Sequence, residues 1–372
     1  MRKTLALFLS LVIALSLFAG CAKSGTVSGS PSASAAALSA SPASTTQTVT
    51  DMAGRQVTIP ANVKSVYCAV PTAEAMVTSL CPEKLVGWVN KQTDATLKYL
   101  PASLAKLPVI GGWMGQQVTA NIEDIVKLAP DVIIYMGTNV MSNTDKTPQD
   151  IQTKTNIPVV VCSSALTDTA ATYRFLGKVL GASDRAETLA SYCDKKLGEI
   201  KADVAKVPDS AKATVYYAEG KGGLSTDPTG SDHTEVLDLC NVTNVANVEK
   251  LAGQGMTAVS IEQIINWNPS VILVSGQAPA NYNAILTDAS WKNIKAVKDG
   301  KVYYTPVAPF NWFDRPPNVM RILSVSWFAN KIYPDYVKID TNQEIKDFFK
   351  LFYNDALTDS DVQALLATPT AG

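Results

Sequence analysis

A stretch of 17 residues occurs twice in the chain, at residues 121–137 and again at residues 260–276, with seven identical positions. Each copy opens on a residue that favours the N-cap of a helix, Asn121 or Ser260, and continues with apolar residues at helical spacing. A proline then stops the helix, and a short β-rich apolar run follows, as in a buried parallel strand. Each half of the chain is therefore predicted to carry the same helix–strand unit of an α/β layer.

A second unit recurs earlier in each half. The apolar runs at residues 63–70 and 214–218 are predicted strands, and each leads through a loop into a helix that begins near Thr72 or Thr234. Because both units occur in the same order, we predict an α/β fold of two similar lobes with parallel-rich sheets and a ligand cleft between them.

The segment between the predicted lobes, residues 168–207, is rich in Ala, Leu, Lys and Glu. Ser183 or Asp184 can cap a helix that runs to about Lys206, where Pro208 prevents its continuation. A long rigid helix between two lobes implies limited closure around the ligand.

The N-terminus carries the pattern of an export signal. Basic residues precede an uncharged apolar run at residues 5–19, which is typical of a secretory signal peptide and short for a membrane span. The run ends in Leu-Phe-Ala-Gly-Cys at residues 17–21, which resembles the bacterial lipobox except that Phe18 stands where leucine is usual. Lipid attachment at Cys21 is therefore predicted, and an ordinary signal peptide followed by an unrelated cysteine is the alternative.

Residues 22–48 are almost entirely Ala, Gly, Ser, Thr and Pro, a composition that predicts a flexible tether because it offers too little apolar surface to bury. No second membrane span is predicted. The predicted division of the chain is a signal peptide at 1–20, a lipidated cysteine and tether at 21–48, an N-terminal lobe at 49–166, a bridging helical segment at 167–210, and a C-terminal lobe with C-terminal helices at 211–372.

The charge and the histidine content exclude several functions. Lys and Arg number 32 and Asp and Glu number 33, so the chain lacks the basic excess that nucleic-acid binding needs. His233 is the only histidine, which excludes a nitrogen-rich zinc or manganese site. No Gly-x-Ser-x-Gly elbow is present either, and we predict no enzymatic activity and no intrinsic cofactor. A secreted hydrolase or a surface adhesion module are the alternatives from other function classes.

The chain contains six cysteines and no Cys-x-x-Cys pair. Without Cys21 an odd number remains, so at least one thiol is free, and the pairing of these five stays open. Cys68 and Cys162 lie inside apolar runs, where buried free thiols are expected, and no disulfide is predicted.

Several segments, taken in order, carry a resemblance to a known family. Together they resemble the iron-chelate/cobalamin class of ABC-transporter substrate-binding proteins, over residues 48–340. The matching segments are Thr50–Pro60, Val66–Glu74, Leu85–Gly87, the "NxExIxxLxPDxVI"-like element at 121–137, and Trp291–Tyr303, in which a tryptophan opens a helix and a Gly-Lys-Val-Tyr strand follows.

The resemblance implies a monomeric lipoprotein or periplasmic protein with two lobes bridged by a long helix. Such a protein would deliver a metal chelate (a ferric siderophore, haem or a corrinoid) to a membrane permease with an ATPase partner. Its place would be the outer face of the cell membrane, held by the lipid, or the periplasmic side in a two-membrane cell. The resemblance also implies two carboxylates that dock on permease arginines, which by position are Glu74 and Glu235. Both lie near predicted helix starts, where an acidic side chain is favourable and usually exposed.

Candidate ligand-binding residues lie in the loops expected to face the cleft. The segment at 310–317 is the densest signal, with three aromatic residues, an arginine and stiffening prolines. Aromatic faces suit a bulky organic chelate, and a guanidinium suits an anionic group on it. The candidates are Trp113, Gln116, Thr138, His233, Tyr282, Trp312 and Arg315.

Two points about the ligand stay open at this stage. His233 and Arg315 could instead enclose a bare oxyanion such as molybdate or tungstate, with the aromatic residues as walls. Whether His233 contacts the ligand or only supports the helix that starts at Thr234 is equally undecided, and no metal ligand is assigned.

Overall fold

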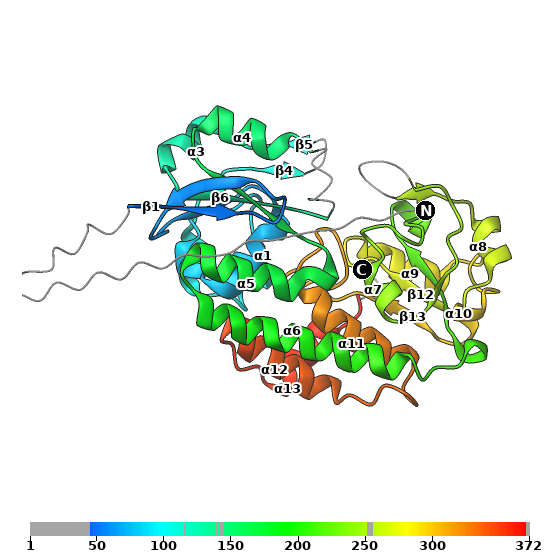
Figure 1. The fold of residues 1–372 in the computed structure, drawn as a ribbon. Helices are drawn as coiled ribbons and strands as arrows, with labels where there is room; N and C mark the ends of the chain where they lie inside the picture. The colour runs from blue at the N-terminus through cyan, green and yellow to red at the C-terminus, as the bar shows by residue number, and fades with distance from the viewer. Residues whose placement is uncertain (1–44, 115–116, 139, 141–144, 251–255, 370–372) are drawn as a thin grey trace, which may run out of the picture. The chain divides into compact units, whose positions relative to one another are not determined.

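Two parallel sheets, one in each half of the chain, form the framework of the protein (Figure 1). The computed structural model describes residues 45–114, 117–138, 140, 145–250 and 256–369. The predicted signal peptide, Cys21 and most of the predicted tether lie outside the described residues.

The first sheet has the strand order β3-β6-β7, formed by Val66–Cys68, Val132–Gly137 and Val159–Ser163, with all strands parallel. Nearly every residue of these strands is buried, which explains their continuous apolar sequence. The second sheet has the order β10-β8-β12-β13, also parallel; its strands are Thr243–Asn244, Thr214–Ala218, Val271–Val274 and Val302–Tyr304.

The internal repeat is confirmed in three dimensions. The repeated helices are α3, Ile122–Leu128, and α8, Ile261–Trp267. Each leads into the strand that pairs with β3 or β8, the earliest strand in the chain of its parallel sheet. The side chain of Asn121 accepts hydrogen bonds at the start of α3, and Ser260 forms a capping box with Gln263 at the start of α8. The helices of the earlier unit are α1, Pro71–Leu80, and α7, Glu235–Leu239.

The predicted bridging helix is α6, Ser183–Val204, and it follows a separate helix, α5, Thr169–Leu180. Helices α5 and α11, Met320–Ile332, lie beside α6 (Figure 1). One apolar cluster joins one face of each sheet to these helices, and the opposite face of each sheet packs in a cluster of its own. The shared cluster fits the limited closure expected of a helix-bridged protein.

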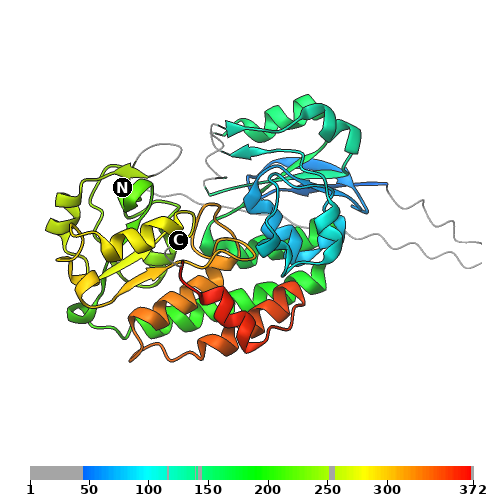
Figure 2. The same ribbon diagram turned by 180° about the vertical axis from the view of Figure 1, so that it is seen from behind.

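The C-terminal helices α12, Thr341–Tyr353, and α13, Asp359–Leu366, are placed differently from the prediction. Helix α12 packs on α1 of the first half (Figure 2). Lys98 Nζ lies 2.8 Å from Asp361 Oδ1. The assignment of these helices to a C-terminal lobe at 211–372 is therefore wrong. The apolar stripe of α12 is completed by aromatic side chains of the first half, such as Tyr99 against Phe349.

Two smaller expectations also need correction. The tether does not extend to residue 48, because strand β1, Thr46–Thr50, pairs antiparallel with β2, Gln56–Pro60. Trp291 does not open a helix; it is buried in a turn that precedes α10, Lys295–Lys298.

No helix among the described residues is long and apolar enough to span a bilayer. The five described cysteines are free and buried, as expected for Cys68 and Cys162. The other elements are α2 Asp94–Leu97, β4 Trp113–Met114, β5 Gln117–Val118, α4 Thr147–Thr155, β9 Ser225–Thr226, β11 Thr257–Ala258 and α9 Pro279–Thr287, with 3-10 turns at Pro82–Lys84, Ala102–Lys106, Leu166–Asp168, Asp209–Ala211 and Lys221–Gly223.

Candidate ligand-binding site

A pocket of about 560 Å³ lies between the carboxyl ends of the two sheets. Open α/β sheets bind ligands at this edge, because the loops that follow the strands converge there. Both halves of the chain contribute to its wall. The first half supplies Val70, Pro71, Thr72, Asn90, Trp113, Met114, Gln117, Tyr135, Met136, Gly137, Thr138 and Ser164, and the second supplies Asp232, His233, Met256, Gln277, Arg315, Pro316 and Pro317.

Four of the candidate residues line this pocket: Trp113, Thr138, His233 and Arg315. Thr138 follows β6 and donates a hydrogen bond to Asp232 of the other half, so this pair joins the two walls. Gln116 lies outside the described residues.

Trp312 and Tyr282 do not line the pocket. Trp312 is fully buried, its indole N–H donates to the carbonyl of Ala308 at 2.8 Å, and its ring packs edge-to-face on Trp327. Tyr282 lies on α9 and packs edge-to-face against Tyr304. The structure therefore does not place these two aromatic side chains in this pocket, because both take part in apolar packing of the second half.

Arg315 sits on the floor of the pocket among three acidic side chains. Its Nε lies 2.7 Å from Glu219 Oε1 and 3.4 Å from Asp314 Oδ2, and its Nη2 lies 2.5 Å from Asp227 Oδ2. All three carboxyl groups are buried. The expectation that Arg315 pairs with an anionic group of the ligand does not fit this arrangement, because its guanidinium is already compensated by the protein.

His233 is oriented by the same group of acids. Its Nδ1 lies 2.7 Å from Asp314 Oδ1, which fixes the orientation of the ring. Side-chain atoms of Asp227, His233 and Asp314 lie within 4.8 Å of one another, which is close enough to ligate a metal ion. A cation there would have to displace Arg315 from Asp227, so the guanidinium already fills the role of the cation.

Burial raises the pKa of Glu219 to about 9, from 4.5 for the free side chain. Between these values the folded protein keeps a proton that the unfolded chain releases, so this group makes the free energy of unfolding fall as pH rises. Glu219→Gln retains an acceptor for Arg315 but cannot ionise. We expect the variant to gain stability relative to the wild type as pH rises, by up to about 1.4 kcal/mol per pH unit.

Urea denaturation at about pH 6 and about pH 8.5 would measure this difference. Glu123→Gln, at an exposed position on α3, is the control and should show no such trend. A stability difference for Glu219→Gln that does not change with pH would contradict the prediction.

The expectation that Glu74 and Glu235 are exposed is not met: the first is buried and the second is only partly exposed. Glu74 is only 2% exposed and accepts a hydrogen bond from the backbone N–H of Val89, and burial raises its pKa well above the usual range. The side chain of Glu235 is 23% exposed and is bound to Arg321, whose Nη1 lies 2.5 Å from Glu235 Oε2. Neither carboxyl group is presented to solvent as a free surface charge, because the helices that carry them pack into the interior.

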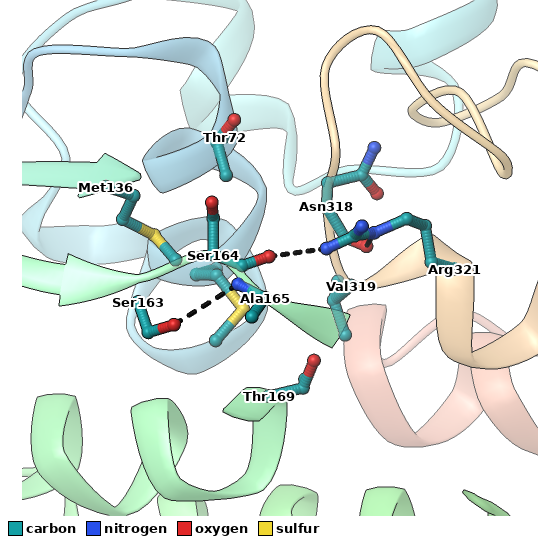
Figure 3. A pocket seen from close by; sticks show the side chains of 10 residues that line it. Thr72, Met136, Ser163, Ser164, Ala165, Thr169, Asn318, Val319 and Arg321 are labelled. Carbon is teal, nitrogen blue, oxygen red and sulfur yellow. Dashed lines mark hydrogen bonds between the residues drawn. The ribbon is translucent and has the colours of Figure 1, made fainter. Parts of the chain in front are cut away.

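Arg321 joins the two halves beneath the pocket. Its Nη2 donates to the carbonyl of Ser164 at 2.5 Å, while Glu235 also accepts from the backbone N–H of Leu166 at 3.1 Å. Figure 3 shows Arg321 reaching Ser164 across a small cavity of about 10 Å³, which adjoins the main pocket at Thr72 and Met136. This buried contact ties the end of β7 to α7 and α11, which again favours limited closure.

Several pocket residues were not anticipated from the sequence. Tyr135 and Met136 line the pocket near the end of β6, and Glu219, which directly follows β8, is buried beside Arg315. Their positions at the carboxyl ends of strands were the available signal. Asp227 and Asp232 lie in the Gly-rich loop before α7, where nothing in the local pattern marks an acidic cluster.

The sequence and the fold of this chain are similar to those of known binding proteins. The model of a family described as periplasmic binding protein matches residues 91–309. A solved ABC transporter solute binding protein from Sulfurospirillum deleyianum is 32% identical, with a TM-score of 0.79, covering 86% of this chain and 98% of that chain.

Curated relatives differ in their ligands. A molybdate-binding protein of Haemophilus influenzae is 26% identical over 338 residues, covering 82% of this chain and 90% of that protein. An iron(3+)-hydroxamate-binding protein of Bacillus subtilis is 25% identical over 190 residues, covering 49% of this chain and 58% of that protein.

Proposed function

We propose that this chain, which belongs to the periplasmic binding protein family, captures a metal chelate in the pocket between its two halves. It then delivers the chelate to a membrane permease. It is a solute-binding component of an ABC transporter and not an enzyme. The transport energy would come from the ATPase that drives the permease.

The size and lining of the pocket carry the proposal of a chelate. A volume of about 560 Å³ lies in the range of pockets that enclose organic ligands, roughly 300–1,000 Å³. Trp113 and Tyr135 offer aromatic faces, and Met114, Met136 and Met256 offer adaptable apolar contacts. This wall suits the organic shell of a siderophore, a corrinoid or haem.

A bare oxyanion is the second candidate, and the molybdate-binding relative, which matches most of the chain, favours it. Molybdate would occupy only a small part of the pocket and would need hydrogen-bond donors around all its oxygens. The side-chain hydroxyl of Thr138 and the guanidinium of Arg315 already have acceptors within the protein, which favours the chelate.

Native mass spectrometry distinguishes these two candidates. The protein is incubated with ferric hydroxamate and catecholate siderophores, haem, cobalamin, molybdate and tungstate, each in slight excess. We expect a 1:1 complex that retains both the metal and its organic chelator. A complex with molybdate or tungstate and with none of the chelates would overturn the chelate proposal and support the oxyanion.

Lipid attachment at Cys21 and a tether that holds the domain near the membrane complete the proposal. An apolar export signal that ends in Ala-Gly-Cys supports it. Cys21→Ser is expected to release the protein from membranes into the soluble fraction, as measured by fractionation and by loss of the lipid mass. A Cys21→Ser protein that stays in the membrane fraction would contradict attachment at this residue.

Docking on the permease requires charges that solvent can reach, and the internal repeat provides a matched pair. Glu123 in the first turn of α3 and Glu262 in the first turn of α8 occupy the same position in the two copies, and both are exposed. We infer that these two acids, in place of Glu74 and Glu235, contact the permease.

A further inference from the structure

We propose that the pocket selects metal chelates whose net charge is zero or positive and discriminates against chelates that carry several negative charges. This inference rests on the chelate-binding function proposed above and adds the charge class of the ligand. The observations that carry it are the commitment of Arg315 to the protein and the surplus of acidic groups around it.

Arg315 is the arginine among the described residues that line the pocket, and no lysine is among them. Its side chain is 14% exposed, and three carboxyl groups surround its guanidinium, at 2.5 Å from Asp227, 2.7 Å from Glu219 and 3.4 Å from Asp314. An anionic ligand could engage this guanidinium fully only by competing with carboxyl groups that are themselves buried and have no water to replace it.

The charges of Arg315, which lines the pocket, and of the acids buried around it do not sum to a positive value. Burial keeps Glu219 protonated at neutral pH, because its pKa is raised to about 9. Asp227 and Asp314 then face the single positive charge of Arg315. A proton on His233, which is bound to Asp314, would bring the sum only to zero.

The rim adds no net positive charge. Asp232 lines the pocket, and Lys250 Nζ lies 3.6 Å from its Oδ1, so the two charges offset each other. Tyr135 donates its hydroxyl proton to Asp145 at 2.5 Å, which places a further carboxylate behind this wall. The stretches that the structure leaves undescribed between residues 115 and 255 contain no ionisable side chain.

A multiply anionic chelate would therefore lose its hydration without gaining a counter-charge, whereas a neutral chelate avoids this cost. A cationic chelate gains further, from the acidic floor and from the negative faces of Trp113 and Tyr135. Charge thus distinguishes ligands that share the same metal and similar size.

Three ferric siderophores of different charge test the inference: ferrichrome, which is neutral, ferrioxamine B, which carries one positive charge, and ferric enterobactin, which is trianionic. Binding is followed by quenching of tryptophan fluorescence, with Trp113 as the reporter in the pocket. We expect the neutral and cationic chelates to bind at least about 100-fold more tightly than ferric enterobactin at about 0.05 M salt, with a smaller ratio at about 1 M salt.

Asp232→Asn provides a variant whose effect depends on the sign of the ligand's charge. It removes one negative charge from the rim, so relative to ferrichrome we expect about 5-fold weaker binding of ferrioxamine B and about 5-fold tighter binding of ferric enterobactin. Asp209→Asn is the matched control, because the Asp209 carboxylate is 95% exposed and precedes β8 at the opposite edge of its sheet. It should leave all three affinities unchanged.

The outcomes separate this inference from the function on which it rests. Tightest binding of ferric enterobactin, or an Asp232→Asn effect of equal size and sign on all three chelates, would overturn the charge selection and leave the chelate function intact. Binding of molybdate with no binding of any chelate, including haem and cobalamin, would overturn the chelate function and this inference with it.

Discussion

Arg315→Met is expected to lower the free energy of unfolding by about 3–5 kcal/mol, because it leaves buried acidic groups without their positive partner. Asp227 and Asp314 are fully buried, and no solvent is available to stabilise their charges once the guanidinium is gone. Methionine retains most of the apolar stem, so the loss reports on charge and hydrogen bonding more than on packing. Urea denaturation at neutral pH measures the change.

Two further variants make this prediction specific. Arg315→Lys keeps the charge but not the planar fork that reaches Glu219 and Asp227 together, so it should lose less than Arg315→Met. Adding Asp227→Asn and Asp314→Asn to Arg315→Met should recover a large part of the lost stability, because the uncompensated charges are then removed. A loss below about 1 kcal/mol for Arg315→Met would contradict the buried charge cluster.

Charge reversal at both repeat acids, Glu123→Lys with Glu262→Lys, is expected to reduce ligand uptake at least about ten-fold while the affinity for the ligand stays unchanged. Both side chains are exposed in the first turn of their helices, so the lysines can be accommodated without disturbing the core. If docking proceeds as proposed, the lysines would repel permease arginines that the glutamates would attract. Uptake is measured in cells that carry the permease and the ATPase, and affinity is measured on the purified protein.

The control for this pair is a second double reversal at exposed acids, Asp209→Lys with Asp359→Lys, whose side chains are 95% and 81% exposed. It makes the same change in net charge and should leave uptake near the wild-type level. Unchanged uptake in the Glu123 and Glu262 variant would show that docking uses another surface. A loss of ligand affinity in that variant would show that the effect is not one of docking.

Charge reversal cannot test docking at Glu74, because this side chain is buried. The same charge reversal at Glu74 would place an ammonium group at a site that is 2% exposed, so a loss of uptake would reflect unfolding. Its position in the first helical turn is shared with Glu123 and Glu262, and only the packing of α1 against the rest of the first half distinguishes it.

Local features of the chain could be predicted because they depend on neighbouring residues. The caps at Asn121 and Ser260, the strands at 214–218 and 271–274, and the long helix from Ser183 all appear where the periodicity placed them. The repeat at an offset of 139 residues also predicted two related parallel sheets, because identical local patterns fold into identical units. The position of the pocket followed from the chain direction, since the carboxyl ends of parallel strands share one edge.

The site residues were predicted less well, because an aromatic or charged side chain has the same local pattern whether it faces a ligand or the core. Trp113 and Trp312 both lie in stretches of sequence rich in turn residues, yet one lines the pocket and the other packs on Trp327. Arg315 does lie in the pocket, but two of its three acidic partners, Asp227 and Glu219, lie 88 and 96 residues earlier in the chain.

The sequence by itself thus determined the class of fold, the repeated units, the bridging helix and the edge at which a ligand binds, because each of these follows from short-range periodicity and chain direction. The tertiary structure alone decided which charges are free, which aromatic side chains face the pocket, and that the C-terminal helices pack on the first half. All three properties depend on contacts between residues that are far apart in the chain. Burial and ion pairing depend on the three-dimensional surroundings, which no local pattern encodes.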